Sequence, residues 1–160
     1  METYLLRHGI AEEPRGSDAE RALTPEGRKK LREVLTVAAS AGVKPTLILT
    51  SPYKRALQTA EMAAEHLGYS GELVRTDSLL PMSDPPHVWT ELRTHKDEDA
   101  LLLAGHEPNM GRLFAFLLGT PSLEVDFKKG AIARVDIDQF GPAPRGLLRW
   151  LLVPKLAARG

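Results

Sequence analysis

The segment TLILTSPYKRALQTAEMAAEHL, residues 46–67, changes from a short apolar run into a helical pattern within a few positions. Thr46–Thr50 is uninterrupted by charge and has the length of a buried strand. Ser51 and Pro52 follow at once, and this pair is typical of a helix start, with Ser51 as the N-cap and Pro52 at the first helical position. The segment therefore predicts a strand that leads into a helix over residues 52–67.

The same alternation extends toward both ends of the chain. Further strands are expected at residues 4–6, 72–76, 100–104, 130–138 and 147–153, and further helices at 25–41, 87–95 and 108–118. This order indicates an α/β fold with a mostly parallel six-stranded sheet. The last two strands have no helix between them and are expected to form a hairpin, which places one antiparallel strand near an edge. The tail from Lys155 is expected to be frayed.

Composition narrows the class of protein. The 160 residues suit one domain spanning residues 1–160, and 42% hydrophobic with 26% charged residues is typical of a globular chain. There is no cysteine, which excludes disulfides and a thiol nucleophile. Lys and Arg number 21 and Asp and Glu number 21, so no overall basic field favours nucleic acid. With no signal peptide and no long apolar run, we expect a cytoplasmic protein without a membrane partner, and a monomer.

Two histidines and two arginines follow the predicted strands directly. Arg7 and His8 end the first strand, Arg55 lies within a helical turn of the second, and His106 follows the fourth. Ligands of open α/β sheets bind outside the carboxyl ends of the strands. We therefore expect these four side chains to lie at one edge of the sheet. Taken alone, each of these four side chains has an ordinary structural explanation, as His66 has late in its helix. The inference therefore depends on their occurring together.

The chemistry of this set fits a phosphate. Guanidinium groups bind phosphate oxygens in pairs, and helix N-termini, expected after Pro52 and Pro108, favour anions. A neutral imidazole is a competent nucleophile. Hydrolysis by a bound metal is the rival, but neither histidine has a carboxylate at a ligand spacing such as H-E-x-x-H, so neither a metal nor a cofactor is expected.

Three segments in this order resemble the histidine phosphatase superfamily, the relatives of phosphoglycerate mutase and acid phosphatase. They are Arg7-His8-Gly9 (its R-H-G motif), Ser51–Ala60, and Gly105-His106-Glu107-Pro108; Leu23–Gly27 also fits the L-T-x-x-G pattern. The short chain and the segment from Asp18 to Gly27 are most similar to the SixA branch, small phosphohistidine phosphatases that act on signalling proteins. The resemblance implies a phosphoglycerate mutase-like, three-layer α/β/α fold.

The resemblance also implies roles. His8 is expected to accept the phosphoryl group and water to hydrolyse the phospho-His8 intermediate, releasing inorganic phosphate, while Arg7, Arg55 and His106 bind the phosphoryl oxygens. Arg21, Gly9 and Glu107 are expected substrate contacts, and Asp18 is the candidate proton donor.

One departure bears on the substrate. Mutase-like members carry an acid after the third strand that protonates the leaving oxygen, and Pro81 stands at that position here. An alkoxide needs such an acid, whereas the imidazole of a phosphohistidine leaves neutral. We therefore expect a phosphorylated protein of the histidine-phosphotransfer type as substrate and a role in signal transduction. The alternatives are a small-molecule phosphomonoesterase of the same superfamily and a non-catalytic phosphate-binding module.

Overall fold

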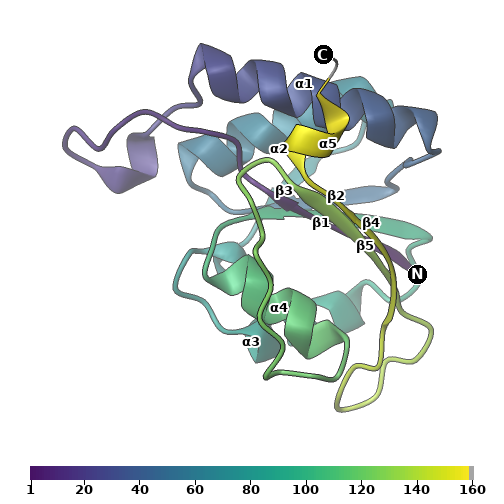
Figure 1. Cartoon of the computed structure of the whole chain (residues 1–160). Coiled ribbons are helices and arrows are strands. Elements are labelled where there is room, and N and C mark those ends of the chain that lie inside the picture. The colour runs from purple at the N-terminus through teal and green to yellow at the C-terminus, as the bar shows by residue number, and fades with distance from the viewer. Residues whose placement is uncertain (159–160) are drawn as a thin grey trace.

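The computed structural model of the chain describes residues 1–158 and contains one six-stranded sheet (Figure 1). The strands are β1 (Glu2–Arg7), β2 (Leu47–Thr50), β3 (Leu73–Arg75), β4 (Ala100–Gly105), β5 (Ile132–Asp136) and β6 (Leu147–Leu152). Their order in the sheet is β3-β2-β4-β1-β5-β6. Strands β3, β2, β4 and β1 pair in parallel, and β5 is antiparallel to both of its neighbours. The prediction of one antiparallel strand near an edge is confirmed.

Helices cover both faces of the sheet, which gives the expected three layers (Figure 1). The helices are α1 (Pro25–Ser40), α2 (Lys54–Leu67), α3 (Pro85–Thr94), α4 (Asn109–Leu117) and α5 (Pro154–Ala157). Buried side chains of α1, α2 and α5 form one core with one face of the sheet, and those of α3 and α4 form a second core with the other face. Since β4 is buried along its whole length, the centre of the sheet is a rigid platform.

The capping signal before α1 forms as predicted. Thr24 is the N-cap, its hydroxyl accepts a hydrogen bond from the Gly27 amide at 3.0 Å, and Pro25 is the first helical residue. Gly27 is buried, and a Cβ added to it would collide with the carbonyl oxygen of Ile10 and lie 3.0 Å from the Ile10 amide nitrogen. The absence of a side chain therefore lets α1 lie directly against the segment that follows His8.

Several predicted boundaries differ from the structure. Helix α3 begins at Pro85 rather than His87, and β5 spans Ile132–Asp136 rather than residues 130–138. Helix α2 begins at Lys54 rather than Pro52, with Tyr53 as its N-cap, because the Ser51 hydroxyl contacts His106 and the Tyr53 amide instead of capping a helix that starts at Pro52. The tail is not frayed over residues 154–157: these form α5, whose buried Ala157 belongs to the α1 core. Residues 159 and 160 lie outside the described part of the chain.

No helix within residues 1–158 is both long enough and apolar enough to cross a membrane.

Candidate active site

Three neighbouring strands bring the predicted catalytic residues to one edge of the sheet. Strand β4 lies between β2 and β1, and the residues that follow these strands continue the ladder: the His8 amide donates to Gly105 O at 2.9 Å, and the Ser51 amide to Ala104 O at 2.9 Å. His8 and His106 consequently face each other, with ring centroids 5.1 Å apart. The clustering expected from the strand pattern is therefore present.

Both ring nitrogens of His8 have hydrogen-bond partners, and the one that faces Arg55 carries the lone pair. Its side chain is buried, and Nδ1 lies 2.7 Å from the carbonyl oxygen of Gly9. A carbonyl oxygen only accepts, so Nδ1 carries the proton and Nε2 carries the lone pair. Burial, together with the charges of Arg55, Arg7 and Lys129, lowers the pKa of His8 to about 4, against the opposing effect of the Gly9 hydrogen bond. At neutral pH the imidazole is therefore neutral and nucleophilic at Nε2.

His106 is also neutral and is oriented by Ser51. Its Nε2 lies 2.7 Å from the Ser51 hydroxyl oxygen, which accepts a hydrogen bond from the Tyr53 amide at 3.2 Å. The Tyr53 ring meets the imidazole edge-on at 5.3 Å. Burial lowers the pKa of His106 to about 3, and the nearby His8, Arg55 and Arg7 add to this effect while Asp18 opposes it. Its ring is thus fixed in place and uncharged at neutral pH.

Arg55 links the histidines to the loop before α1. It lies in the first turn of α2 with 4% of its surface exposed, and its Nε lies 3.4 Å from Nε2 of His8. Its terminal nitrogens donate to the backbone oxygen of Asp18 at 2.8 Å and to its carboxylate at 3.2 Å. Such a fork fits two oxygens of a tetrahedral anion as well as it fits these two oxygens.

Arg7 extends from the end of β1 on the other side of His8. Its Nη1 donates to the carbonyl oxygen of Phe127 at 2.6 Å, and burial lowers its pKa. Within residues 1–158, Nε of Arg7 and Nδ1 of His106 are buried polar atoms without a hydrogen-bond partner. Buried polar atoms are normally paired, so these two atoms retain a capacity for hydrogen bonding that the protein itself does not use.

Asp18 is held as an anion, which disfavours the predicted role of proton donor. It lies in a short 3-10 turn (Asp18–Glu20), and its carboxylate forms ion pairs with Arg21 at 3.0 Å and Arg55 at 3.2 Å. The hydrogen bond from Arg21 is the main cause that lowers its pKa. The negative charge of Asp18 nevertheless acts on His106, where it opposes the lowering of the pKa.

The three expected substrate contacts already have hydrogen-bond partners within the protein. Arg21 binds Asp18 and the backbone oxygen of Glu12, at 2.6 Å, and reaches Arg55 only through Asp18. The Gly9 amide is already bonded to the Thr59 hydroxyl at 3.2 Å. The Glu107 carboxylate accepts a hydrogen bond from the Gly111 amide in the first turn of α4, where a negative charge is favourable. The Gly9 amide and the Glu107 carboxylate are therefore engaged in hydrogen bonds within the protein and are not free to contact a substrate.

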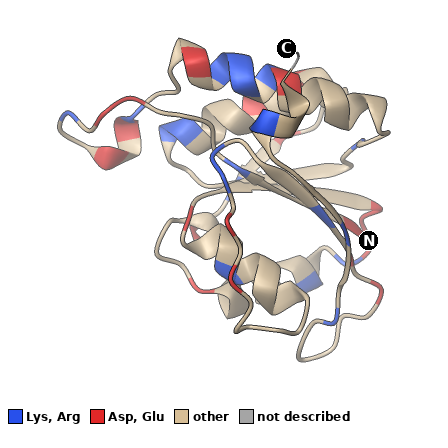
Figure 2. Cartoon of the chain, in the orientation of Figure 1, with Lys and Arg blue, Asp and Glu red and all other residues tan. Residues whose placement is uncertain are grey.

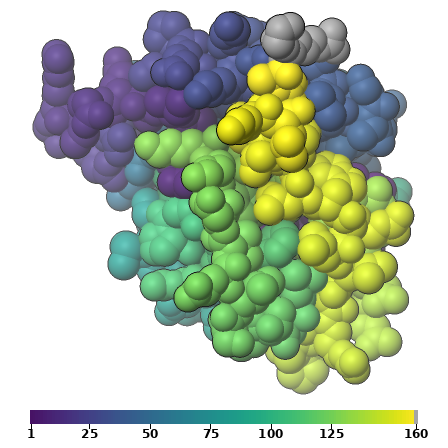
Figure 3. All heavy atoms as spheres, viewed as in Figure 1, coloured from purple at the N-terminus to yellow at the C-terminus, as the bar shows by residue number. Residues whose placement is uncertain are grey.

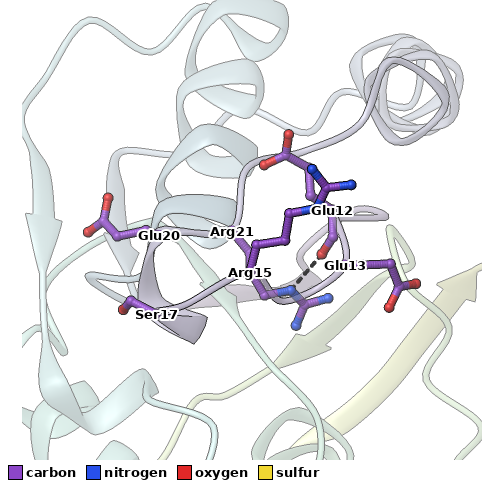
Figure 4. A pocket seen from close by; sticks show the side chains of 6 residues that line it. All are labelled: Glu12, Glu13, Arg15, Ser17, Glu20 and Arg21. Carbon is purple, nitrogen blue, oxygen red and sulfur yellow. Dashed lines mark hydrogen bonds between the residues drawn. The ribbon is translucent and has the colours of Figure 1, made fainter.

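Arg21 also lines a shallow hollow of about 340 Å³ formed by the loop before α1 (Figure 4). The carboxylates of Glu13 and Glu20 lie on opposite sides of it, and Arg15 extends across it (Figure 4). This rim of the site thus mixes both signs of charge. In the described residues, no group of three His, Asp or Glu side chains is arranged to hold a metal ion.

Sequence reasoning missed two residues of the site, Ser51 and Tyr53. Both lie in the quoted segment after β2, where Ser51 was assigned to helix capping. Their position directly after a central strand is the signal that points to the site instead.

The fold, together with the facing histidines and the two arginines, indicates an enzyme that acts on phosphate groups. Comparison with known proteins agrees with this class. Residues 3–80 match the model of the histidine phosphatase superfamily (branch 1). The chain belongs to the histidine phosphatase superfamily and is a phosphatase. Within it, the chain falls in the SixA branch: it is 30% identical over 158 residues to phosphohistidine phosphatase SixA of Escherichia coli (strain K12), which covers 96% of this chain and 94% of that protein.

Solved structures extend the comparison. The protein histidine phosphatase SixA complexed with tungstate shares 29% identity and a TM-score of 0.87, over 97% of this chain and 98% of that one. The alpha-ribazole phosphatase from Shigella flexneri has the same fold at 17% identity, with a TM-score of 0.76 over 96% and 97% of the two chains. The fold is therefore shared by phosphatases with different substrates, and the substrate has to be inferred from the site.

Proposed function

We propose that this chain is a phosphohistidine phosphatase that acts on a phosphorylated signalling protein of the histidine-phosphotransfer type. The observation that carries the proposal is the lone pair on Nε2 of His8, in a buried basic site where the carboxylate paired with Arg55, that of Asp18, is held as an anion by Arg21 and Arg55. Such a site attacks phosphorus readily but is poorly equipped to protonate an alkoxide.

The first half-reaction transfers the phosphoryl group to His8. Nε2 of His8 forms a bond to phosphorus while the P–N bond of the substrate breaks, and the substrate imidazole leaves neutral because its other nitrogen already carries a proton. The proton on Nδ1 of His8 stays on the ring, and the Gly9 oxygen at 2.7 Å stabilises the resulting positive charge. No proton donor is needed in this step, which agrees with Pro81 at the position where other members carry the acid.

The second half-reaction is hydrolysis. A water oxygen attacks phosphorus, the bond to Nε2 breaks with its electron pair returning to His8, and inorganic phosphate leaves with the protons of the water. Charge on the phosphoryl oxygens is expected to be stabilised by Arg7, Arg55 and His106, and positioning with electrostatics is the main source of catalysis in phosphoryl transfer. The unpaired Nε of Arg7 and Nδ1 of His106 support these roles.

A small-molecule phosphomonoesterase is the second candidate. It is favoured by one observation: the Asp18 carboxylate is paired with Arg55. A phosphate group that took its place on the guanidinium would remove one cause of the lowered pKa of Asp18. The carboxyl group could then take up a proton from solvent and pass it to the leaving oxygen. The third reading, a binding module without catalysis, does not agree with the family assignment.

The deciding experiment compares kcat/KM for phosphohistidine, free and within a phosphorylated histidine-phosphotransfer domain, with a panel of phosphomonoesters. Each rate is corrected with the His8→Ala protein, because phosphohistidine also hydrolyses without enzyme. We expect phosphohistidine to be preferred. A strong preference for esters would contradict the P–N assignment and leave the phosphatase class intact.

A further inference from the structure

A second hollow, of about 680 Å³, lies beside the site on the side of Arg7, and we refer to it as the basic pocket. Four lysines line it: Lys30 from α1, Lys128 and Lys129 from the segment before β5, and Lys155 from α5. The blue segments of α1, of the segment before β5 and of α5 gather at this end of the molecule (Figure 2). Asp126 is the one acidic residue of its lining.

The basic pocket is open to a partner. All four lysines are exposed, and in the space-filling view α5 and the segment before β5 lie side by side on the face turned to the viewer (Figure 3). Val153 and Pro154, both half-buried, form an apolar part of its wall. The pocket thus combines lysine ammonium groups with a small apolar surface.

Much of this positive charge is unpaired inside the protein. Lys30 pairs with Glu26 at 3.1 Å and Lys128 with Asp126 at 3.1 Å, whereas neither Lys129 nor Lys155 has an ion pair within residues 1–158. The chain as a whole has a formal net charge of 0, so this excess is local. The loop on the other side of the site carries Glu12, Glu13 and Glu20 together with Arg15 and Arg21, so its charge is mixed, whereas lysines prevail in the basic pocket.

The basic pocket is coupled to the reacting group. Arg7 lines the pocket and directly precedes His8 in the chain. In addition, the positive charge of Lys129 is one of the causes of the lowered pKa of His8. A protein that presents a phosphohistidine to His8 therefore places its neighbouring surface over these lysines.

We propose that the basic pocket docks an acidic segment of the phosphorylated protein, one that carries Asp or Glu side chains around an apolar residue next to the phosphohistidine. The inference rests on charge complementarity. The unpaired lysines can form ion pairs with carboxylates of a partner, and Val153 and Pro154 can contact an apolar side chain. A nucleic acid fits less well, because the lysines form one small patch on a chain without net charge. The inference rests on the proposed function, since it assumes a protein substrate.

The test reverses two charges of the pocket with Lys128→Glu and Lys155→Glu together. Lys129 is left unchanged because its charge acts on His8. The matched control is Lys44→Glu with Lys96→Glu, two exposed lysines that precede β2 and β4 and so lie at the opposite edge of the sheet. Both double variants change the net charge equally.

For the phosphorylated histidine-phosphotransfer domain we expect kcat/KM to fall about tenfold in the pocket variant, mainly through KM, and less at high salt. For free phosphohistidine we expect kcat/KM within about twofold of the parent, because the docking segment is absent. The control variant should match the parent for both substrates. An equal fall for free phosphohistidine, an equal fall in the control variant, or no fall at all would overturn the docking assignment.

A binding measurement separates this inference from the proposed function. Fluorescence anisotropy of a labelled glutamate-rich peptide containing leucine reports docking without any turnover. Weaker binding in the pocket variant alone supports the assignment even if phosphohistidine proves not to be a substrate. Binding that is unchanged by the pocket substitutions, or weaker than that of a labelled single-stranded oligonucleotide, overturns it.

Discussion

Nε of Arg55 lies 3.4 Å from Nε2 of His8, the nitrogen that carries the lone pair. The same guanidinium binds the backbone and carboxylate oxygens of Asp18 with its other two nitrogens. Arg55 is therefore placed to move from Asp18 onto the oxygens of a phosphoryl group that arrives at His8. This arrangement makes Arg55 the link between substrate binding and the loop before α1.

Replacing Arg55 with alanine should weaken tungstate or phosphate binding by about 1.5–3 kcal/mol, the usual contribution of a charged hydrogen bond. Titration calorimetry measures the change directly. Arg55→Lys is the matched variant: it retains the charge but loses the planar fork, so an intermediate affinity is expected. Unchanged oxyanion affinity in Arg55→Ala would contradict the assigned role.

His8→Ala should abolish turnover of every substrate, because no other imidazole can present a lone pair at this position. In the parent protein, quenching during turnover should trap a label on His8 that is labile in acid and stable in base. His66→Ala is the control, since this half-buried histidine bonds Met62 O late in α2, away from the site. Near-normal hydrolysis by His8→Ala would refute the covalent mechanism.

Asp18→Asn tests whether the carboxylate acts as a competitor for Arg55 or as an acid. We expect tungstate to bind about two- to fivefold more tightly, since the anion paired with Arg55 is removed, while phosphohistidine turnover is retained. Inhibition assays on Asp18→Asn and on Glu20→Gln, an exposed acid of the same turn, provide the comparison. A collapse of phosphohistidine turnover in Asp18→Asn alone would show that this reaction needs a proton from Asp18.

The free energy of unfolding should fall in acid because both site histidines are neutral in the fold. Their folded-state pKa values, about 4 for His8 and about 3 for His106, lie below the ordinary value near 6.5. Between pH 6.5 and about 4 the unfolded chain therefore binds more protons than the folded chain, so acid favours unfolding. Each histidine contributes a slope of about 1.4 kcal/mol per pH unit in that window.

Urea denaturation at several pH values checks this slope. His8→Asn should remove about half of the pH dependence that the two histidines contribute. An identical slope in His8→Asn and the parent would show that the burial of His8 does not control its protonation.

Gly27→Ala should destabilise the fold by about 1–3 kcal/mol, the usual cost of adding a methyl group to a filled space. The new Cβ would collide with the Ile10 backbone, which cannot move away without displacing the segment after His8. The midpoint of urea denaturation measures the loss. Gly141→Ala is the control, because its Cβ would meet no atom within 4 Å, and equal stability of the two variants would contradict the packing role of Gly27.

Much of this architecture is predictable from local patterns. The buried strands β1, β2 and β4 are short apolar runs, and Thr24 with Pro25 marks the start of α1 correctly. Because parallel strands share a carboxyl edge, the strand pattern alone brings His8 and His106 together. The common edge of the candidate site residues thus follows from secondary structure, whereas their close approach depends on the position of β4 between β2 and β1.

Other features depend on contacts between distant parts of the chain. Ser51 is a good N-cap by local rules, yet its hydroxyl contacts His106, 55 positions later, and α2 starts at Lys54. Asp18 and Arg55 are 37 positions apart, and their ion pair is not encoded in either local sequence. The tail was expected to fray because local signals do not show that Ala157 is buried beside α1.

The position of the site on β2, β4 and β1 has a consequence for how the enzyme loses activity on heating. These strands are the interior of the sheet, and β4 is buried along its whole length, so we expect the candidate catalytic groups to separate only when the central strands themselves come apart. Inactivation by heat should therefore coincide with global unfolding and show no earlier local step. The residual activity of a heated sample should then be proportional to the fraction of molecules that are still folded.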